Sequence, residues 1–157
     1  MKLEIVLIDR TDQAYLQTGL DLYAKRLQHY CRLQLTVLQS AAAWSKLKPD
    51  ELKQRQGEML LKRVAPGPAV YRLDEGGQQL SSRQLASLIE REDLYGSGGM
   101  TLIIGGPYGF SPEVQEAYPR AISLSRMTFS HQMVRLLLIE QLYRAFTIIR
   151  GEPYHHD

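Results

Sequence analysis

The chain has 157 residues, of which 44% are hydrophobic and 23% charged, and its formal net charge at pH 7 is only +2. This length suits one globular domain with its own core, so we expect a single domain over residues 1–157. Basic and acidic residues are mixed along the chain, so charge alone does not indicate a nucleic-acid-binding protein. The single cysteine, Cys31, excludes an internal disulfide. Together with the absence of a long apolar run, this predicts a cytoplasmic protein.

Apolar patterns near the start of the chain alternate between strand and helix. The nearly continuous apolar run from Lys2 to Asp9 predicts a strand buried on both faces, and Arg32 to Leu38 predicts a second strand. Between them, apolar residues recur at steps of four and three, which predicts a helix that Thr11 or Asp12 caps. This stripe consists of Leu16, Leu20, Tyr23, Leu27 and Tyr30.

The middle of the chain continues this alternation. We expect a loop at 41–48 and then a helix that begins at Pro49-Asp50-Glu51, is largely exposed, and ends at Pro66-Gly67-Pro68. A third strand is predicted at Ala69–Leu73, followed by a flexible turn at Asp74-Glu75-Gly76-Gly77.

The second half adds two strands and three helices. Ser81 or Ser82 is expected to cap one helix, and Ser111-Pro112-Glu113 begins another. The fourth strand is predicted at Thr101–Ile104, and Ile122 and Leu124 mark the fifth. This order of elements predicts an α/β fold, a mostly parallel sheet with helices on both faces.

The last helix is predicted from His131 to Arg150 and is apolar on nearly all sides. A helix of this composition is buried in the core or in a subunit contact. Glu140 and Arg144 are four residues apart and can form a modest ion pair. His131 and Arg135 share a face at the start of the helix, where a lone histidine is more often structural than catalytic.

Two loops follow predicted strands and are candidates for a ligand site. In open parallel sheets, ligands bind beyond the carboxyl ends of the strands. The glycine-rich turn Gly105–Gly109 allows close approach of the backbone to a ligand, although a purely structural tight turn has the same composition. It lacks the spacing of dinucleotide and phosphate-binding loops. The segment Leu124–Phe129 mixes polar and apolar residues, so it could line an adenine pocket or simply pack.

The tail from Pro153 to Asp157 places a tyrosine beside two histidines. Such side chains can stack on a base or donate to a phosphate, whereas most chain ends are disordered. The histidines have no partners at the spacing of metal ligands, so we expect no metal site.

Several of these segments resemble one family closely. It is the RlmH family, the SPOUT-class methyltransferases that modify pseudouridine in large-subunit ribosomal RNA. The matching motifs are Ile104-Gly105-Gly106-Pro107-x-Gly109, Leu124-Ser125-x-Met127-Thr128-Phe129-x-His131-x-Met133-x-Arg135, Glu140-Gln141-x-Tyr143-Arg144-Ala145 and Tyr154-His155. The resemblance covers essentially the whole chain. It departs at Asp9-Arg10-Thr11, where relatives usually have a glycine after the first strand, and at the ending His156-Asp157.

The resemblance implies a C-terminal deep trefoil knot, S-adenosylmethionine as methyl donor, and a homodimer whose site lies at the subunit interface. It implies N3-methylpseudouridine in the helix 69 loop of 23S rRNA as the product, made on the assembled 70S ribosome. The implied cofactor contacts are Leu73, Gly105, Leu124, Ser125, Arg126, Met127, Thr128 and Phe129. The imide N–H must lose its proton, so a general base or an anion-stabilising field is needed. By chemistry and family position, the catalytic candidates are His131, Arg135, Tyr154 and His155.

Two other functions remain open from the sequence. One is a non-catalytic RNA- or ribosome-binding module that keeps a nucleotide-like pocket. The other is a SPOUT enzyme that acts on transfer RNA. Binding of labelled S-adenosylmethionine tests the first, and methylation of ribosomes against free transfer RNA tests the second.

Overall fold

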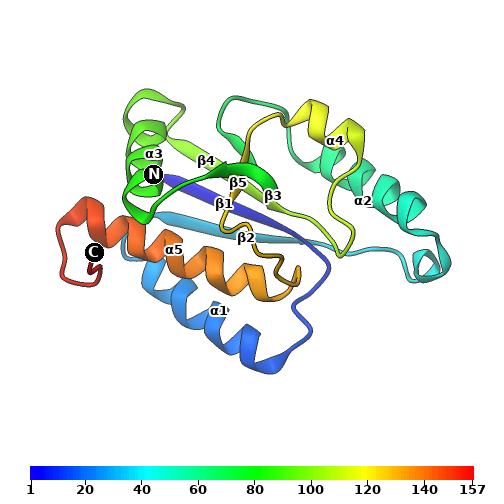
Figure 1. Ribbon diagram of the computed structural model, residues 1–157, viewed down its shortest axis with the longest axis horizontal. Coiled ribbons are helices and arrows are strands. Elements are labelled where there is room, and N and C mark those ends of the chain that lie inside the picture. The colour runs from blue at the N-terminus through cyan, green and yellow to red at the C-terminus, as the bar shows by residue number, and fades with distance from the viewer.

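The computed structural model describes all 157 residues and has one five-stranded sheet in the order β2-β1-β4-β3-β5 (Figure 1). Every neighbouring pair of strands is parallel, which confirms the predicted α/β sheet. The strands are β1 (Lys2–Ile8), β2 (Arg32–Leu38), β3 (Val70–Gln79), β4 (Gly99–Ile104) and β5 (Ala121–Ser123). The helices are α1 (Ala14–Leu27), α2 (Pro49–Arg63), α3 (Ser82–Tyr95), α4 (Pro112–Ala117) and α5 (Met133–Arg150), with a short 3₁₀ helix at Ala42–Lys46.

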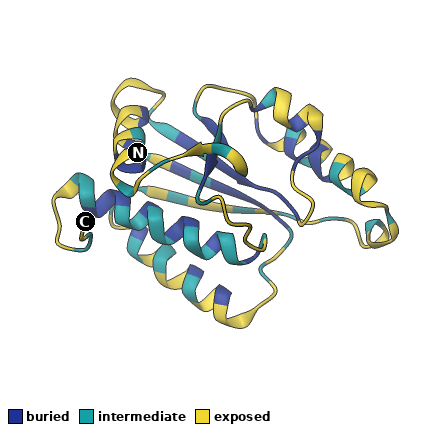
Figure 2. Ribbon diagram, viewed as in Figure 1, coloured by how far each residue is buried: buried dark blue, intermediate teal, exposed yellow.

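Helices cover both faces of the sheet, as the apolar run in β1 predicts. Leu3, Ile5 and Leu7 belong to the core cluster that the sheet forms with α1, α3 and α5. Val6 and Ile8 point to the opposite face and belong to a second cluster with α2 and α4. Because side chains alternate along a strand, a run that is apolar at every position is buried on both sides. Figure 2 shows the buried strands between the helical layers.

The beginnings of the helices follow the predicted caps in two cases and not in a third. Ser81 accepts a hydrogen bond from the Gln84 backbone N–H (3.1 Å), and Ser111 caps α4. The prediction that Thr11 or Asp12 caps α1 was wrong, because the cap position is Gln13 and no side chain bonds there. The Thr11 hydroxyl instead accepts a hydrogen bond from Arg135 (3.0 Å).

Two other boundaries differ from the sequence prediction. The expected loop at 41–48 contains the 3₁₀ helix Ala42–Lys46. The expected turn Asp74–Gly77 lies inside β3, which continues to Gln79. Pairing of β3 with β5 shifts register between Leu73 and Gln78, so the glycine-containing segment interrupts the ladder without ending the strand.

The long helix α5 runs beside α1 and α3 and carries the chain away from the strand ends (Figure 1). Its buried residues face the core, but Leu136, Leu137 and Tyr143 are only half-buried. The helix is therefore embedded on one side and leaves apolar surface on another. The trefoil knot implied by the family resemblance stays a prediction.

Candidate active site

A cavity of about 410 Å³ opens beyond the ends of β4 and β5, beside Leu73–Glu75 in the middle of β3. This volume is within the range typical of small-molecule sites. Its walls come from this part of β3, from the loops that follow β4 and β5, and from the start of α5. Seven of the eight predicted cofactor contacts line it, namely Leu73, Gly105, Leu124, Ser125, Met127, Thr128 and Phe129, and the eighth, Arg126, does not.

The glycine turn after β4 is closely packed against the protein itself. A Cβ atom on Gly105 would lie 3.2 Å from the Gly109 carbonyl oxygen and 3.2 Å from the Phe110 ring. A Cβ on Gly106 would lie 2.6 Å from Oε1 of the buried Gln56. The Gly109 N–H donates to the Gly106 carbonyl (3.1 Å), and Gly109 adopts a φ of 78° that favours glycine. The turn therefore exposes backbone to the cavity because neighbouring side chains leave no space for larger residues.

Hydrogen bonds hold the second loop in place after β5. The Ser123 hydroxyl donates to the Ser125 carbonyl (2.8 Å), and the Ser125 hydroxyl accepts from the Met127 N–H (3.0 Å). Thr128 donates to Glu75 on the extension of β3 (2.8 Å). The Met127 side chain is 73% exposed, so the loop presents its backbone and apolar side chains to the cavity rather than to the core.

His131 and Arg135 lie at the same end of α5 but point to different surroundings. His131 lines the cavity and is half-buried. Burial, and then the nearby Arg135 cation, lower its pKa below the ordinary 6.5, while Asp12 and Asp9 oppose the shift. The imidazole is therefore neutral at pH 7 and able to accept a proton.

The Arg135 side chain is 2% exposed and does not line the cavity. Its guanidinium donates to the Ile8 carbonyl (2.6 Å) and the Asp9 carbonyl (2.9 Å), and Nε donates to the His131 carbonyl (3.2 Å). With the bond to Thr11, these contacts join the end of β1 to the start of α5. Arg135 therefore has a structural role: it holds the backbone at His131 and does not reach the cavity surface.

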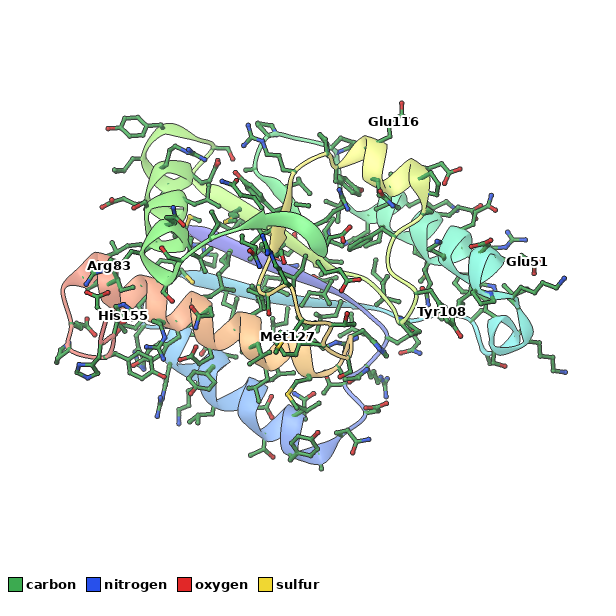
Figure 3. The ribbon with its side chains drawn as sticks, in the orientation of Figure 1. Glu51, Arg83, Tyr108, Glu116, Met127 and His155 are labelled. Atoms are coloured by element: carbon green, nitrogen blue, oxygen red, sulfur yellow. The ribbon has the colours of Figure 1, made fainter.

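The other two catalytic candidates, Tyr154 and His155, follow the C-terminal end of α5, where Figure 3 labels His155. Tyr154 packs edge-on against Tyr143, with ring centroids 4.7 Å apart, and its hydroxyl donates to Glu140 (3.0 Å). Tyr154 is thus packed against α5, unlike the disordered residues typical of chain ends. Burial, together with hydrogen bonds to Tyr23 and Glu140, raises its pKa above the ordinary 10.0.

His155 is held by other residues of the same end. Its Nε2 lies 2.9 Å from an Asp157 oxygen, and Asp157 also accepts from Arg83 of α3. The predicted pair between Glu140 and Arg144 is present, and the Arg144 guanidinium lies over the Tyr154 ring at 4.8 Å. Neither Tyr154 nor His155 lines the cavity, because α5 has 18 residues and is about 27 Å long.

An apolar groove of about 660 Å³ joins the two ends. It shares Leu124 and Phe129 with the cavity and runs along α5 past Leu136 to Arg144. Groove residues Tyr23, Glu140 and Arg144 are the ones that contact the tail. The surface between the cavity and the tail is therefore continuous and largely apolar.

Sequence reasoning did not identify every residue of the cavity. Lys53 of α2, Glu75 of β3 and Tyr108 of the glycine turn also line it. Lys53 is the least foreseeable, because nothing in its local pattern distinguishes it from other helix lysines. Only the packing of α2 beside the glycine turn brings it to the wall.

No helix has the length and apolar character needed to cross a membrane. No group of three or more His, Cys, Asp or Glu side chains is arranged to hold a metal ion.

Comparison with known proteins agrees with this fold. A family described as "Predicted SPOUT methyltransferase" matches residues 1–155. A probable methyltransferase from Bordetella pertussis superposes with a TM-score of 0.53 at 13% identity, covering 92% of this chain and 95% of that one. TrmJ from Z. mobilis superposes with a TM-score of 0.51, also at 13% identity, covering 98% of this chain and 72% of the other. These define the class as SPOUT methyltransferases, with the solved structures supporting the fold alone.

Two curated relatives define the family more narrowly. Ribosomal RNA large subunit methyltransferase H of Porphyromonas gingivalis is 42% identical over 157 residues, covering all of both chains. The protein of the same name from Christiangramia forsetii is 42% identical over 156 residues, covering 99% of each. The chain belongs to this family, the RlmH group of SPOUT methyltransferases.

Proposed function

We propose that this protein transfers a methyl group from S-adenosylmethionine to N3 of a pseudouridine in the helix 69 loop of 23S rRNA, on the assembled 70S ribosome. The observation that carries the proposal is the cavity beyond the ends of β4 and β5 and beside the middle of β3, in a chain that belongs to the RlmH family throughout its length. Acting on ribosomes would place the enzyme in the cytoplasm.

The cavity suits the methyl donor in both shape and chemistry. Leu73, Leu124 and Phe129 offer apolar walls for an adenine ring, and the two backbone-rich loops offer N–H and carbonyl groups for its polar edge. Lys53 provides a cation on the same wall, which can face a carboxylate. When bound, S-adenosylmethionine supplies an already activated methyl group. The chain's own task is then to hold the acceptor in line and to remove one proton.

His131 is the residue best placed to accept the N3 proton. It is the only histidine on the cavity wall, and its lowered pKa keeps Nε2 or Nδ1 free of a second proton at pH 7. Arg135 acts through it as a positioning residue, since Arg135 bonds to the His131 carbonyl and to the end of β1. Tyr154 and His155 complete the site by positioning the nucleotide. They follow the C-terminal end of α5, whereas the cavity of their own chain lies at its N-terminal end, so within one chain they do not reach it.

A homodimer would bring the tail residues of one chain to the cavity of the other. In a two-fold contact along α5, the tail of each chain can approach the cavity of the other. The half-buried apolar residues Leu136 and Leu137 and the groove beside them supply a surface that such a contact would cover. Light scattering should give twice the mass of the chain at micromolar concentration, and a stable monomer would contradict the proposal. The family's trefoil knot is proposed here as well, and an experimental structure tracing residues 105–150 tests it.

The deciding experiment is methylation of ribosomes from a strain that lacks this activity. Tritiated S-adenosylmethionine is supplied, and the modified nucleotide is identified by mass spectrometry. We expect one N3-methylpseudouridine per 70S particle and no label on free transfer RNA. Label on transfer RNA alone would favour a different SPOUT substrate. Cofactor binding without transfer to either RNA would favour a binding module.

A variant links this activity to the cavity. Gly105→Val should abolish binding of S-adenosylmethionine in calorimetric titration. Because the added side chain also meets Phe110, thermal melting must accompany the titration. Leu124→Asp places a charge on the half-buried cavity wall without touching the glycine turn, and it should weaken binding as well. Two folded variants with unchanged affinity would exclude this cavity as the cofactor site.

A further inference from the structure

A second cavity, of about 560 Å³, opens beside the first and has no part in the mechanism above. It shares His131 and Pro107 with the cofactor cavity. Its other walls come from the segment after β1, the segment after β2 and the inner side of α2. A molecule lying in this second cavity would therefore be next to the one in the first, separated only by the histidine and the glycine turn.

The walls of the second cavity are fixed by hydrogen bonds from residues far apart in sequence. Asp9 adopts a φ of 63°, a left-handed backbone conformation that favours glycine. Its carboxylate accepts from the Ser40 N–H (2.6 Å) and the Ser40 hydroxyl (3.1 Å). Gln132 accepts from the Asp12 N–H (3.1 Å) and donates to the Arg10 carbonyl (3.2 Å). The cavity is thus preformed, and much of the Asp9 charge is taken up by Ser40.

The side chains around it have the composition of a nucleotide site. Trp44, the only tryptophan, stands half-buried on the 3₁₀ helix and lines the cavity, and its indole N–H makes no hydrogen bond within the chain. Arg10 lines the cavity too and forms no ion pair, while Asp9 and Asp12 bring two carboxylates to the same wall. Lys46 and Lys48 follow Trp44 on the same segment but do not line the cavity. Aromatic faces beside unpaired cations are what single-stranded RNA requires, because its bases stack and its phosphates are charged.

We propose that the second cavity holds one unstacked nucleotide of the RNA substrate, with the base against Trp44 and the phosphate toward Arg10. This rests on the proposed function, since it names the place where RNA enters beside the methyl donor. The polar wall gives the base edge partners as well, because the Gln39 side-chain carbonyl is free to accept a hydrogen bond. Loop nucleotides suit such a cavity because their bases are already partly unstacked.

The single tryptophan makes the proposal directly measurable. The full-length protein is titrated with a stem-loop oligoribonucleotide with an unpaired loop, and with a fully paired duplex of the same stem. The emission of Trp44 should be quenched by the stem-loop and not by the duplex, whose bases are stacked. Equal quenching by both would overturn base stacking, and unchanged emission at saturating stem-loop would overturn the site.

Substitutions test the same point by affinity. Trp44→Leu should weaken binding of the labelled stem-loop about tenfold, the size expected from the loss of one stacked base. Trp44→Phe keeps an aromatic face and should lose less than about threefold. Tyr95→Leu is the matched control, because it removes an aromatic residue that is 84% exposed at the end of α3. Stem-loop binding by Trp44→Leu that equals that of the control would overturn the proposal.

The test of the nucleotide site can be distinguished from the test of the proposed methyl transfer. Trp44→Leu should bind S-adenosylmethionine like the wild type and melt within a few degrees of it. It should raise KM for ribosomes about tenfold with little change in kcat. Wild-type methylation of ribosomes together with an unchanged KM in Trp44→Leu would reject the second cavity and leave the proposed function standing. If the wild type methylates no RNA, the proposed function fails, whereas Trp44 quenching by the stem-loop would still support the nucleotide site.

Discussion

The two ends of α5 carry the same kinds of side chain, yet the fold uses them differently. At the first end, Arg135 is almost completely buried and bonds to backbone carbonyls, while His131 faces a cavity. At the second end, the Arg144 guanidinium lies over the Tyr154 ring and pairs with Glu140, and these groups stay partly exposed. The first end forms part of the wall of the 410 Å³ cavity, and the second end borders only the apolar groove along α5.

This difference indicates how the proposed site is divided. Contacts at the first end fix the position of the proton acceptor relative to the strand ends and depend on a single chain. Contacts at the second end hold Tyr154 and His155 in a defined arrangement before any substrate is present. Ordering these side chains in advance lowers the entropy that must be lost when RNA binds. The following predictions test the division of roles.

The largest effect on stability is expected for Arg135→Met. The substitution removes the donors that the Ile8 and Asp9 carbonyls use, so buried acceptors lose their partners. We expect the free energy of unfolding to fall by about 3 kcal/mol, measured by urea denaturation. Arg150→Met, an exposed arginine on the same helix, should cost less than about 1 kcal/mol. Equal losses in the two variants would contradict the clamping role of Arg135.

The largest effect on activity at the other end is expected for Tyr154→Ala. Misplacement of reacting groups by about 1 Å can cost about a hundredfold in rate, and we expect a loss of that order in ribosome methylation. Loss of the packing on Tyr143 should also lower stability, by about 1 kcal/mol. Tyr154→Phe keeps the ring contact and loses the bond to Glu140, so it should be milder in both measurements.

Mixing two inactive proteins tests whether the ends cooperate between chains. If Tyr154 serves the cavity of the other chain, heterodimers of Tyr154→Ala and His131→Ala contain one intact site. Random exchange of subunits should then restore about a quarter of the wild-type rate, because half of the dimers are mixed and each has one active site of two. If both residues serve the cavity of their own chain, every site stays damaged and the mixture stays inactive.

The smallest effect is a pH dependence of stability due to His131. Its pKa in the folded protein lies below the ordinary 6.5, mainly because burial disfavours the charged imidazolium. The unfolded chain therefore binds more protons, and the free energy of unfolding falls as the pH is lowered through 6.5 toward the folded pKa. His131→Asn should reduce this slope in urea denaturation at pH 7.5, 6.5 and 5.5. His156→Asn, an exposed change in the tail, should leave the slope as it is.

Much of this protein was determined by local sequence alone. The unbroken apolar run of β1 predicted burial on both faces, and Ser81 and Ser111 predicted the starts of α3 and α4. Parallel strands follow from the alternation of strands with helices, and the glycine turn and the loop after β5 were correctly predicted to meet at one cavity. These features depend on near neighbours, on side-chain period and on backbone conformation, which a short stretch of sequence contains.

The tertiary structure decided which polar groups found each other. In the sequence, Arg135 and His131 lie at the same end of one helix. Only packing against the end of β1 turned the Arg135 side chain inward, where it donates to the Ile8 carbonyl. Arg135 also donates to the Thr11 hydroxyl, which was expected to cap α1. Likewise, only the fold brought Trp44 and His131 to the walls of the same second cavity and kept Tyr154 away from the first. Such partners lie many tens of residues apart, and several donors compete for each acceptor. The choice among them is made by the shape of the whole core, because each buried polar group must be paired once the core has closed.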